Sequence, residues 1–281
     1  EEGAFYNNVS GNTNKFQIGP FSTSGTSAAR AGQNGQGAFA ATVVISQLIC
    51  PSSGGGNTCE TSASGPTNGL SWSSEYGTME SSMGSKIALT NYKAMAGTHM
   101  VTTGSATVPV ANGAIQFTPD QSVPTSLSTT PWLASRAGVT AGSVSDGMSK
   151  TVMVAETKER GYSSWIDGTT CWVVAYDPNQ AVPFNVNGVW GTVNSSPTTP
   201  ITRSGLNYAA SLPSTRYLPA ASFGSRMANG MAWGPSSDHQ GGITMHAFGD
   251  THVSQITGDV DPGIYLSICS RNGQESSGLT E

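Results

Sequence analysis

Residues 232–256, AWGPSSDHQGGITMHAFGDTHVSQI, decide the fold of this chain because they combine two strand-like runs with a short turn. The runs GITMHAF and HVSQI are rich in β-branched and aromatic residues, and Gly, Asp and Thr stand between them. We predict a β-hairpin with a two-residue turn at Asp250–Thr251, which sets Phe248 opposite Val253.

The same segment holds three of the four histidines, which raises the question of a metal site. Side chains alternate between the two faces of a strand, so the predicted register places His246 and His252 on opposite faces. Ligands on opposite faces cannot bind one metal ion. We therefore predict no metal site here, and we rank a metallohydrolase built on His239, His246, His252 and Asp250 third among the functions considered. His239 precedes the hairpin in the turn SSDHQGG and is expected to bracket loop and sheet by hydrogen bonding.

The rest of the chain predicts an α+β fold with an antiparallel β-sheet and long loop insertions. Residues 86–270 contain further short strand-like runs, namely IALTNYKAMAG, HMVTTG, AIQF, KTVMVAETKE, TTCWVVAYD and GVWGTV. Residues 37–49, GAFAATVVISQLI, predict a helix that Pro51 ends. Residues 51–85 predict a loop-rich insertion, and residues 271–281 predict a flexible tail.

The composition excludes several classes of function. Charged residues make up 10% of the chain, against about 25% in ordinary soluble domains. The net charge is −5 and the chain has no Lys/Arg cluster, which weighs against nucleic acid as a partner. No apolar run reaches the length of about 18 residues that a transmembrane helix needs. A polar but uncharged surface is typical of extracellular or cell-surface proteins.

The four cysteines predict disulfides, because CPSSGGGNTC places two of them at the ends of a flexible loop. We predict the pairs Cys50–Cys59 and Cys171–Cys269, which implies an oxidising compartment. Four buried thiols are the alternative. Two cysteines on one loop do not make a zinc site, which normally needs four ligands.

Motifs for catalysis and for cofactors are missing from the sequence. There is no G-x-S-x-G nucleophile elbow, no H-E-x-x-H, no P-loop and no EF-hand loop. Asp259 and Asp261, in GDVDPG, predict a turn cap before Pro262 rather than a calcium site. We therefore predict a protein that is not an enzyme and has no cofactor and no metal.

Several blocks of the chain resemble a family of prepilin-like proteins of unknown function that is abundant in planctomycetes. The C-terminal block GPSSDHQGGITMHAFGDTHVSQITGDVDPGIYLSICSRNGQE resembles its His-to-Asp-Gly motif. EEGAFYNN, ISQLICPSS, LTNYKAMAGTH and VSDGMSKTVMVAET resemble four further blocks in the family's order. The chain departs from the pattern in three places. Ten residues separate His239 from Asp250, one more than in the family, and Thr251 and Gln274 replace glycines.

The resemblance implies a single pilin-like globular head over residues 1–281. In the family, a prepilin leader and a long hydrophobic helix precede the EEGAFYNN block, and by resemblance we expect this chain to be the globular head without that helix. The protein would then contact a membrane only through that helix. The implied function is a structural subunit, a pilin or pseudopilin, that self-assembles into a bacterial extracellular filament or other surface assembly. The implied structural residues are His239, Gly241, Gly242, Asp250, Asp146 and Gly147.

Tryptophans suggest where the subunit makes contacts. Trp72 and Trp233 lie in polar surroundings and are candidate contact residues. Trp172, in the apolar run CWVVAY, is expected in the core. Exposed aromatic side chains in Ser/Thr/Gly-rich loops also suit sugars, so a cell-surface glycan-binding or adhesin module is the alternative to a structural subunit.

Overall fold

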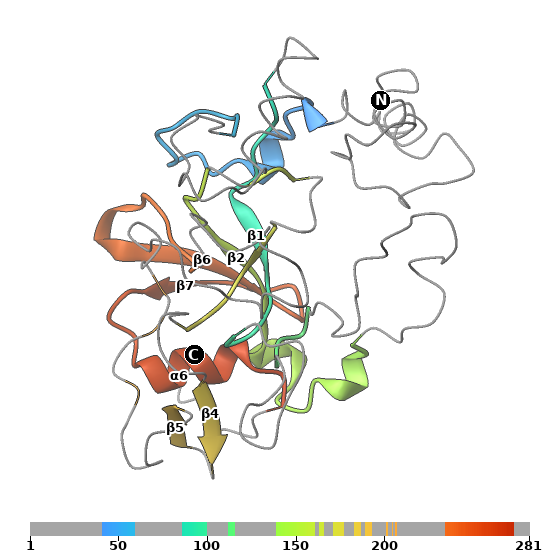
Figure 1. The fold of residues 1–281 in the computed structure, drawn as a ribbon, viewed down its shortest axis with the longest axis vertical. Helices are drawn as coiled ribbons and strands as arrows, with labels where there is room; N and C mark the ends of the chain where they lie inside the picture. Colours follow the sequence, from blue (N-terminus) through green and yellow to red (C-terminus); the bar gives the residue numbers. More distant parts are fainter. Residues whose placement is uncertain are drawn as a thin grey trace, which may run out of the picture.

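A five-stranded β-sheet with strand order β3-β1-β2-β6-β7 forms the centre of the molecule (Figure 1). The computed structural model describes residues 41–59, 86–99, 112–115, 139–160, 163–165, 171–176, 183–186, 189–192, 201, 204, 206 and 234–272. The strands of this sheet are β1 (Tyr92–Met95), β2 (Val152–Glu156), β3 (Trp172–Val173), β6 (Ile243–Phe248) and β7 (Val253–Thr257). A separate antiparallel pair is formed by β4 (Pro183–Val186) and β5 (Val189–Thr192).

The predicted α+β class is confirmed, with a mixed sheet. β1, β2, β6 and β7 are antiparallel neighbours, whereas β3 runs parallel to β1. Burial alternates along β6, as expected of a strand with one face on the core. No helix in the described ranges combines the length and the apolar character needed to cross a bilayer.

The α-helix α6 (Pro262–Cys269) covers one side of the sheet and was not predicted. The predicted cap at Asp261 is confirmed, since its side chain accepts a hydrogen bond from the backbone N–H of Ile264 at 3.0 Å. Pro262 occupies the first turn, where its missing N–H costs nothing. An N-cap Asp followed by Pro therefore starts a helix here, rather than only ending a turn.

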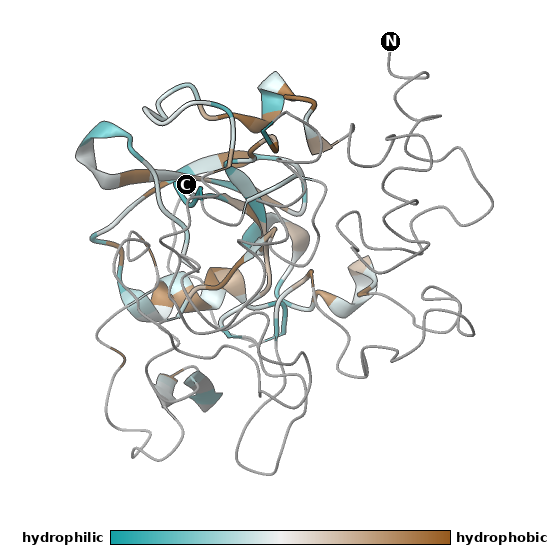
Figure 2. Ribbon diagram, turned by 45° about the horizontal axis from the view of Figure 1, so that its top comes forward, coloured by the Kyte–Doolittle hydropathy of each residue, from teal (hydrophilic) through white to brown (hydrophobic). Residues whose placement is uncertain are grey.

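The hydrophobic core lies between the sheet and α6 (Figures 1 and 2). Tyr265, Ile268 and Cys269 of the helix belong to this main cluster. Leu266 belongs to a second cluster with Trp190 of β5, so α6 packs against the sheet and against the smaller strand pair. The prediction that Trp172 lies in the core is confirmed, because its side chain is 2% exposed.

The predicted helix over residues 37–49 is wrong for its described part. Only Ala41 is helical, and residues 42–49 contain a single 3-10 turn, η2 (Ser46–Leu48), flanked by extended Ile45 and Ile49. The run of β-branched residues before it disfavours the helix, because branching at Cβ restricts the side-chain rotamers of a helix. Residues 37–40 lie outside the described ranges, as do residues 60–85 of the predicted insertion and residues 273–281 of the predicted tail.

The hairpin of β6 and β7 is confirmed, but its predicted register is off by one residue. Ala247, rather than Phe248, pairs with Val253. The connection is a three-residue turn, in which the N–H of Thr251 donates to the carbonyl of Phe248 at 3.0 Å. Thr251 takes φ 79°, the left-handed position that normally follows a type I turn in such a loop. The extra turn residue shifts the register.

The shifted register also overturns the prediction that His246 and His252 lie on opposite faces. Phe248 now faces His252, and their rings stack with centroids 4.3 Å apart. His246 pairs with Ser254, two positions along β7 from His252, so both histidines lie on one side of the hairpin.

Candidate functional site

The three histidines of the C-terminal segment have different surroundings, although His246 and His252 lie on the same side of the hairpin. His246 is fully buried, with Nδ1 3.0 Å from the carbonyl oxygen of Thr244 and Nε2 2.9 Å from the hydroxyl of Tyr265. The carbonyl can only accept, so Nδ1 carries the proton and Nε2 accepts from the tyrosine. His252 is exposed, and its Nδ1 lies 2.6 Å from Oδ1 of Asp250 in the turn. Both are bound into the architecture of the hairpin.

The third histidine, His239, meets two residues from distant parts of the chain. Its Nε2 lies 3.5 Å from Sγ of Cys50 and 3.3 Å from Oε1 of Glu156. One ligand-type atom from each residue lies within 4.8 Å of the other two. In the part of the chain that the structure describes, these three make up the one group of three or more His, Cys, Asp or Glu side chains placed so closely. We call them the Cys–Glu–His cluster.

Cys50 is held in place through its backbone. It follows η2, and its N–H donates to the side-chain oxygen of Asn91 at 2.9 Å. The side-chain amide of Asn91 donates in turn to the carbonyl of Thr157 at 3.0 Å. Asn91, which is 1% exposed, therefore ties the backbone of Cys50 to the residue that follows Glu156.

Glu156, the last residue of β2, is held at both its backbone and its carboxylate. Its carbonyl accepts from the N–H of Ser236 at 2.9 Å. One carboxylate oxygen accepts from the N–H of Met245 at 3.2 Å, and the other faces His239. The side chain is 2% exposed, and burying a carboxylate is costly unless it is well paired.

His239 stands where the loop returns to β6. Its N–H donates to the hydroxyl of Ser237, and that hydroxyl donates to the carbonyl of Ile243. The short 3-10 turn η6 (Gln240–Gly242) follows, with Gly241 at φ 81° and Gly242 at φ 69°. Residues with a Cβ rarely adopt such backbone angles, which explains why glycine occupies both positions.

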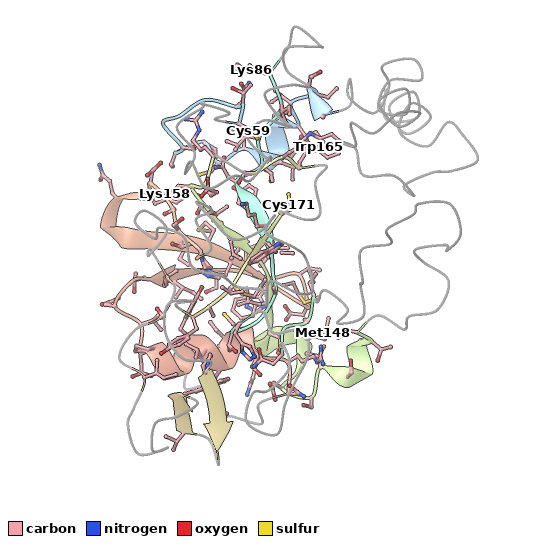
Figure 3. All side chains as sticks on the ribbon, in the orientation of Figure 1. Cys59, Lys86, Met148, Lys158, Trp165 and Cys171 are labelled. Carbon is pink, nitrogen blue, oxygen red and sulfur yellow. The ribbon has the colours of Figure 1, made fainter. Side chains whose placement is uncertain are left out.

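The rim of the cluster is polar and open to solvent. Lys158, labelled in Figure 3 just beyond β2, lies 3.7 Å from Asp238, with both side chains partly exposed. The His239 side chain is 28% exposed, so the cluster lies near the surface while its thiol and carboxylate are buried.

The surroundings favour the neutral thiol of Cys50. Burial raises the pKa of this thiol, and its hydrogen bond to Glu156 raises it further. Burial is also the largest of the causes that raise the pKa of the nearby Tyr92 hydroxyl. A cysteine with a raised pKa is a poor nucleophile. The arrangement suits hydrogen bonding or cation binding better than covalent catalysis.

The two predicted disulfides are wrong, since all four cysteines are thiols. Cys50 faces His239, and the thiol of Cys59 donates to the carbonyl of Ala88. The thiol of Cys171 donates to the carbonyl of Ser164 at 2.7 Å, and Cys269 is buried beside Tyr265 (Figure 3 labels Cys59 and Cys171). Each sulfur has an acceptor or a packing partner of its own, so the spacing of the cysteines was not informative.

Asp146 and Gly147, two of the structural residues that the resemblance implies, lie in and directly after a turn. The N–H of Gly147 donates to the carbonyl of Val144 at 3.2 Å, and Gly147 adopts φ 96°. The N–H of Asp146 donates to the carbonyl of Arg271, which ties this turn to the chain after α6. The candidate contact residues Trp72 and Trp233 lie outside the described ranges.

Comparison with known proteins places this chain in a protein family. Residues 13–263 match the model of a family described as "Protein of unknown function (DUF1559)". The chain belongs to the DUF1559 family. No curated protein and no solved structure matches the chain.

All three cluster residues lie inside the part that matches the DUF1559 model. Each also belongs to a different one of the motif blocks ICPSS, MVAET and SDHQGG. The spacing of the cysteines predicts a disulfide for Cys50, and no sequence pattern predicts a role for Glu156. Each of the three residues lies in its own short motif. A Cys, a Glu and a His in separate motifs of one family were the sequence signal for a shared site.

Proposed function

We propose that this chain is a non-catalytic structural subunit of an extracellular pilin-like filament or other cell-surface assembly. The observation that carries the proposal is the structural use of His246 and His252. His246 holds Thr244 and Tyr265 together, and His252 holds the turn through Asp250. Neither is positioned as a general base beside a nucleophile. The resemblance of several sequence blocks to prepilin-like proteins and the low content of charged residues also support the proposal.

The edge strand β7 suits contact between subunits. β7 pairs with β6 along one side, and no strand in the described ranges pairs with its other side. Val253 at its start is 59% exposed. An open strand edge can pair with a strand of another chain, and an exposed apolar side chain adds to such a contact. Self-assembly through β7 is therefore part of the proposal.

A matched pair of variants tests this proposal. Val253→Lys places a charge on the proposed contact edge, and Val189→Lys places the same charge on β5, where the valine is 48% exposed. Sedimentation velocity over a range of protein concentrations and electron microscopy of the native source would measure assembly. We expect wild type and Val189→Lys to assemble and Val253→Lys to stay monomeric.

Two results would speak against the proposal. Equal assembly of both variants would show that β7 is not the contact between subunits. A chain that stays monomeric at all concentrations and binds a glycan saturably would favour the glycan-binding module instead.

A further inference from the structure

We propose that the Cys–Glu–His cluster binds one Zn²⁺ ion through Cys50 Sγ, Glu156 Oε1 and His239 Nε2. The three atoms come from a loop after η2, the end of β2 and the loop before β6. A bound ion would tie these three segments together at one end of the sheet.

The two separations that involve His239 Nε2 fit a tetrahedral zinc ion. Zinc bond lengths with a tetrahedral angle place a thiolate sulfur and an imidazole nitrogen about 3.6 Å apart, and a nitrogen and a carboxylate oxygen about 3.4 Å apart. The structure has 3.5 Å between Cys50 Sγ and His239 Nε2, and 3.3 Å between His239 Nε2 and Glu156 Oε1. The nitrogen–oxygen distance is long for a hydrogen bond to a carboxylate.

The charges in the cluster also favour a cation. Glu156 is 2% exposed, and the ion pair described for it is with His239. That pair is a true ion pair only when the imidazole is protonated. A divalent cation would compensate the buried carboxylate directly, and it would make a thiolate of Cys50 favourable as well.

The chemical step of binding is a simple exchange of a proton for the metal. Zn²⁺ takes the place of the thiol proton of Cys50, which passes to solvent. His239 binds as neutral imidazole through Nε2, so its proton is on Nδ1. Three protein ligands leave one tetrahedral position for water. A mixed set of thiolate, imidazole and carboxylate favours Zn²⁺ over Mg²⁺ and Ca²⁺, which prefer oxygen alone.

The neighbouring residues hold the ligands as a binding site requires. Asn91 fixes the backbone of Cys50, and the N–H of Met245 fixes the second carboxylate oxygen of Glu156. Ser237 fixes the backbone of His239. Such partners orient the ligands before the ion arrives, which raises affinity.

Metal analysis of the full chain, purified without a polyhistidine tag, tests the site. Dialysis against Zn²⁺ followed by inductively coupled plasma mass spectrometry should find one zinc per chain. Co²⁺ in place of zinc should give the near-ultraviolet charge-transfer band of a cobalt–thiolate bond and the intense visible bands of four-coordinate cobalt. Zinc should also raise the thermal unfolding temperature, and a chelator should reverse the rise.

Matched variants separate ligands from bystanders. His239→Gln removes a partly exposed ligand and should weaken zinc binding by about tenfold or more, since even the loss of an outer partner costs 10–100-fold. His252→Gln removes another partly exposed histidine and should bind like wild type. Cys50→Ala should abolish the charge-transfer band, whereas Cys59→Ala should keep it.

Three outcomes would overturn the proposal. They are no zinc above that of the His239→Gln variant, a cobalt complex without the thiolate band, and equal affinities of the His239→Gln and His252→Gln variants. The cluster would then be a hydrogen-bonded bracket between loops. Metal content is counted per chain whether or not the chains assemble, so failure here leaves the proposed assembly untouched.

Discussion

Lowering the pH from 7 to 5 should cost the folded protein about 2 kcal/mol through His246 alone. Burial lowers the pKa of this histidine from 6.5 to about 4, partly offset by the carbonyl of Thr244. Between these two values the unfolded chain binds a proton that the folded chain does not. The stabilisation is therefore complete above pH 6.5 and is lost as the pH falls toward 4.

The magnitude follows from the size of the shift. One pKa unit corresponds to about 1.4 kcal/mol, so the whole shift is worth about 3 kcal/mol, of which about 2 kcal/mol disappears between pH 7 and pH 5. Urea unfolding followed by tryptophan fluorescence would measure it, because Trp172 and Trp190 are buried and become exposed on unfolding.

Two variants isolate the contribution of His246. His246→Gln removes the titrating group, so its loss of stability from pH 7 to pH 5 should be smaller than that of wild type by about 2 kcal/mol. Tyr265→Phe removes the hydroxyl partner but keeps the imidazole buried, so it should be less stable at pH 7 and keep most of the wild-type pH dependence. Equal losses in wild type and His246→Gln would refute the reasoning.

Three further changes should alter the free energy of unfolding, each measurable by urea denaturation at pH 7. Thr251→Gly should raise it by about 1 kcal/mol, because glycine adopts the positive φ of this position without the strain of a Cβ; a decrease would mean that the threonine side chain makes a compensating contact. Asp261→Ala should lower it by about 1 kcal/mol through loss of the α6 cap, and Asp261→Asn should keep most of the stability. Asn91→Ala should lower it by about 2 kcal/mol, because the buried N–H of Cys50 loses its acceptor; no change would mean that water replaces the amide.

Local patterns in the sequence predicted the strands well. The runs that became β1, β2, β3, β5, β6 and β7 were recognisable because strand propensity and turn residues are local signals. β4 was missed, although the dipeptide Asn187-Gly188 after it is a strong hairpin signal. The register of β6 and β7 was missed because a turn with Thr251 at positive φ is unusual for a β-branched residue.

The candidate site could not be assembled from local patterns. Cys50, Glu156 and His239 are far apart in the chain, and tertiary contacts of two loops with the sheet bring them together. The spacing of Cys50 and Cys59 suggested a bond between them, yet each is held by a different partner. Spacing gives proximity along the chain, whereas ligand geometry depends on tertiary structure.

The strand order has a consequence for how the protein folds. β2 lies in the middle of the sheet, between β1 at residues 92–95 and β6 at residues 243–248. β2 therefore cannot complete its pairing until β6 has left the ribosome. Folding that depends on pairing between distant strands is slow, and strand edges stay unpaired and exposed until that pairing is complete. The β6–β7 hairpin and α6 are contiguous in sequence, so they can form early and act as the template onto which β2 and β1 pair.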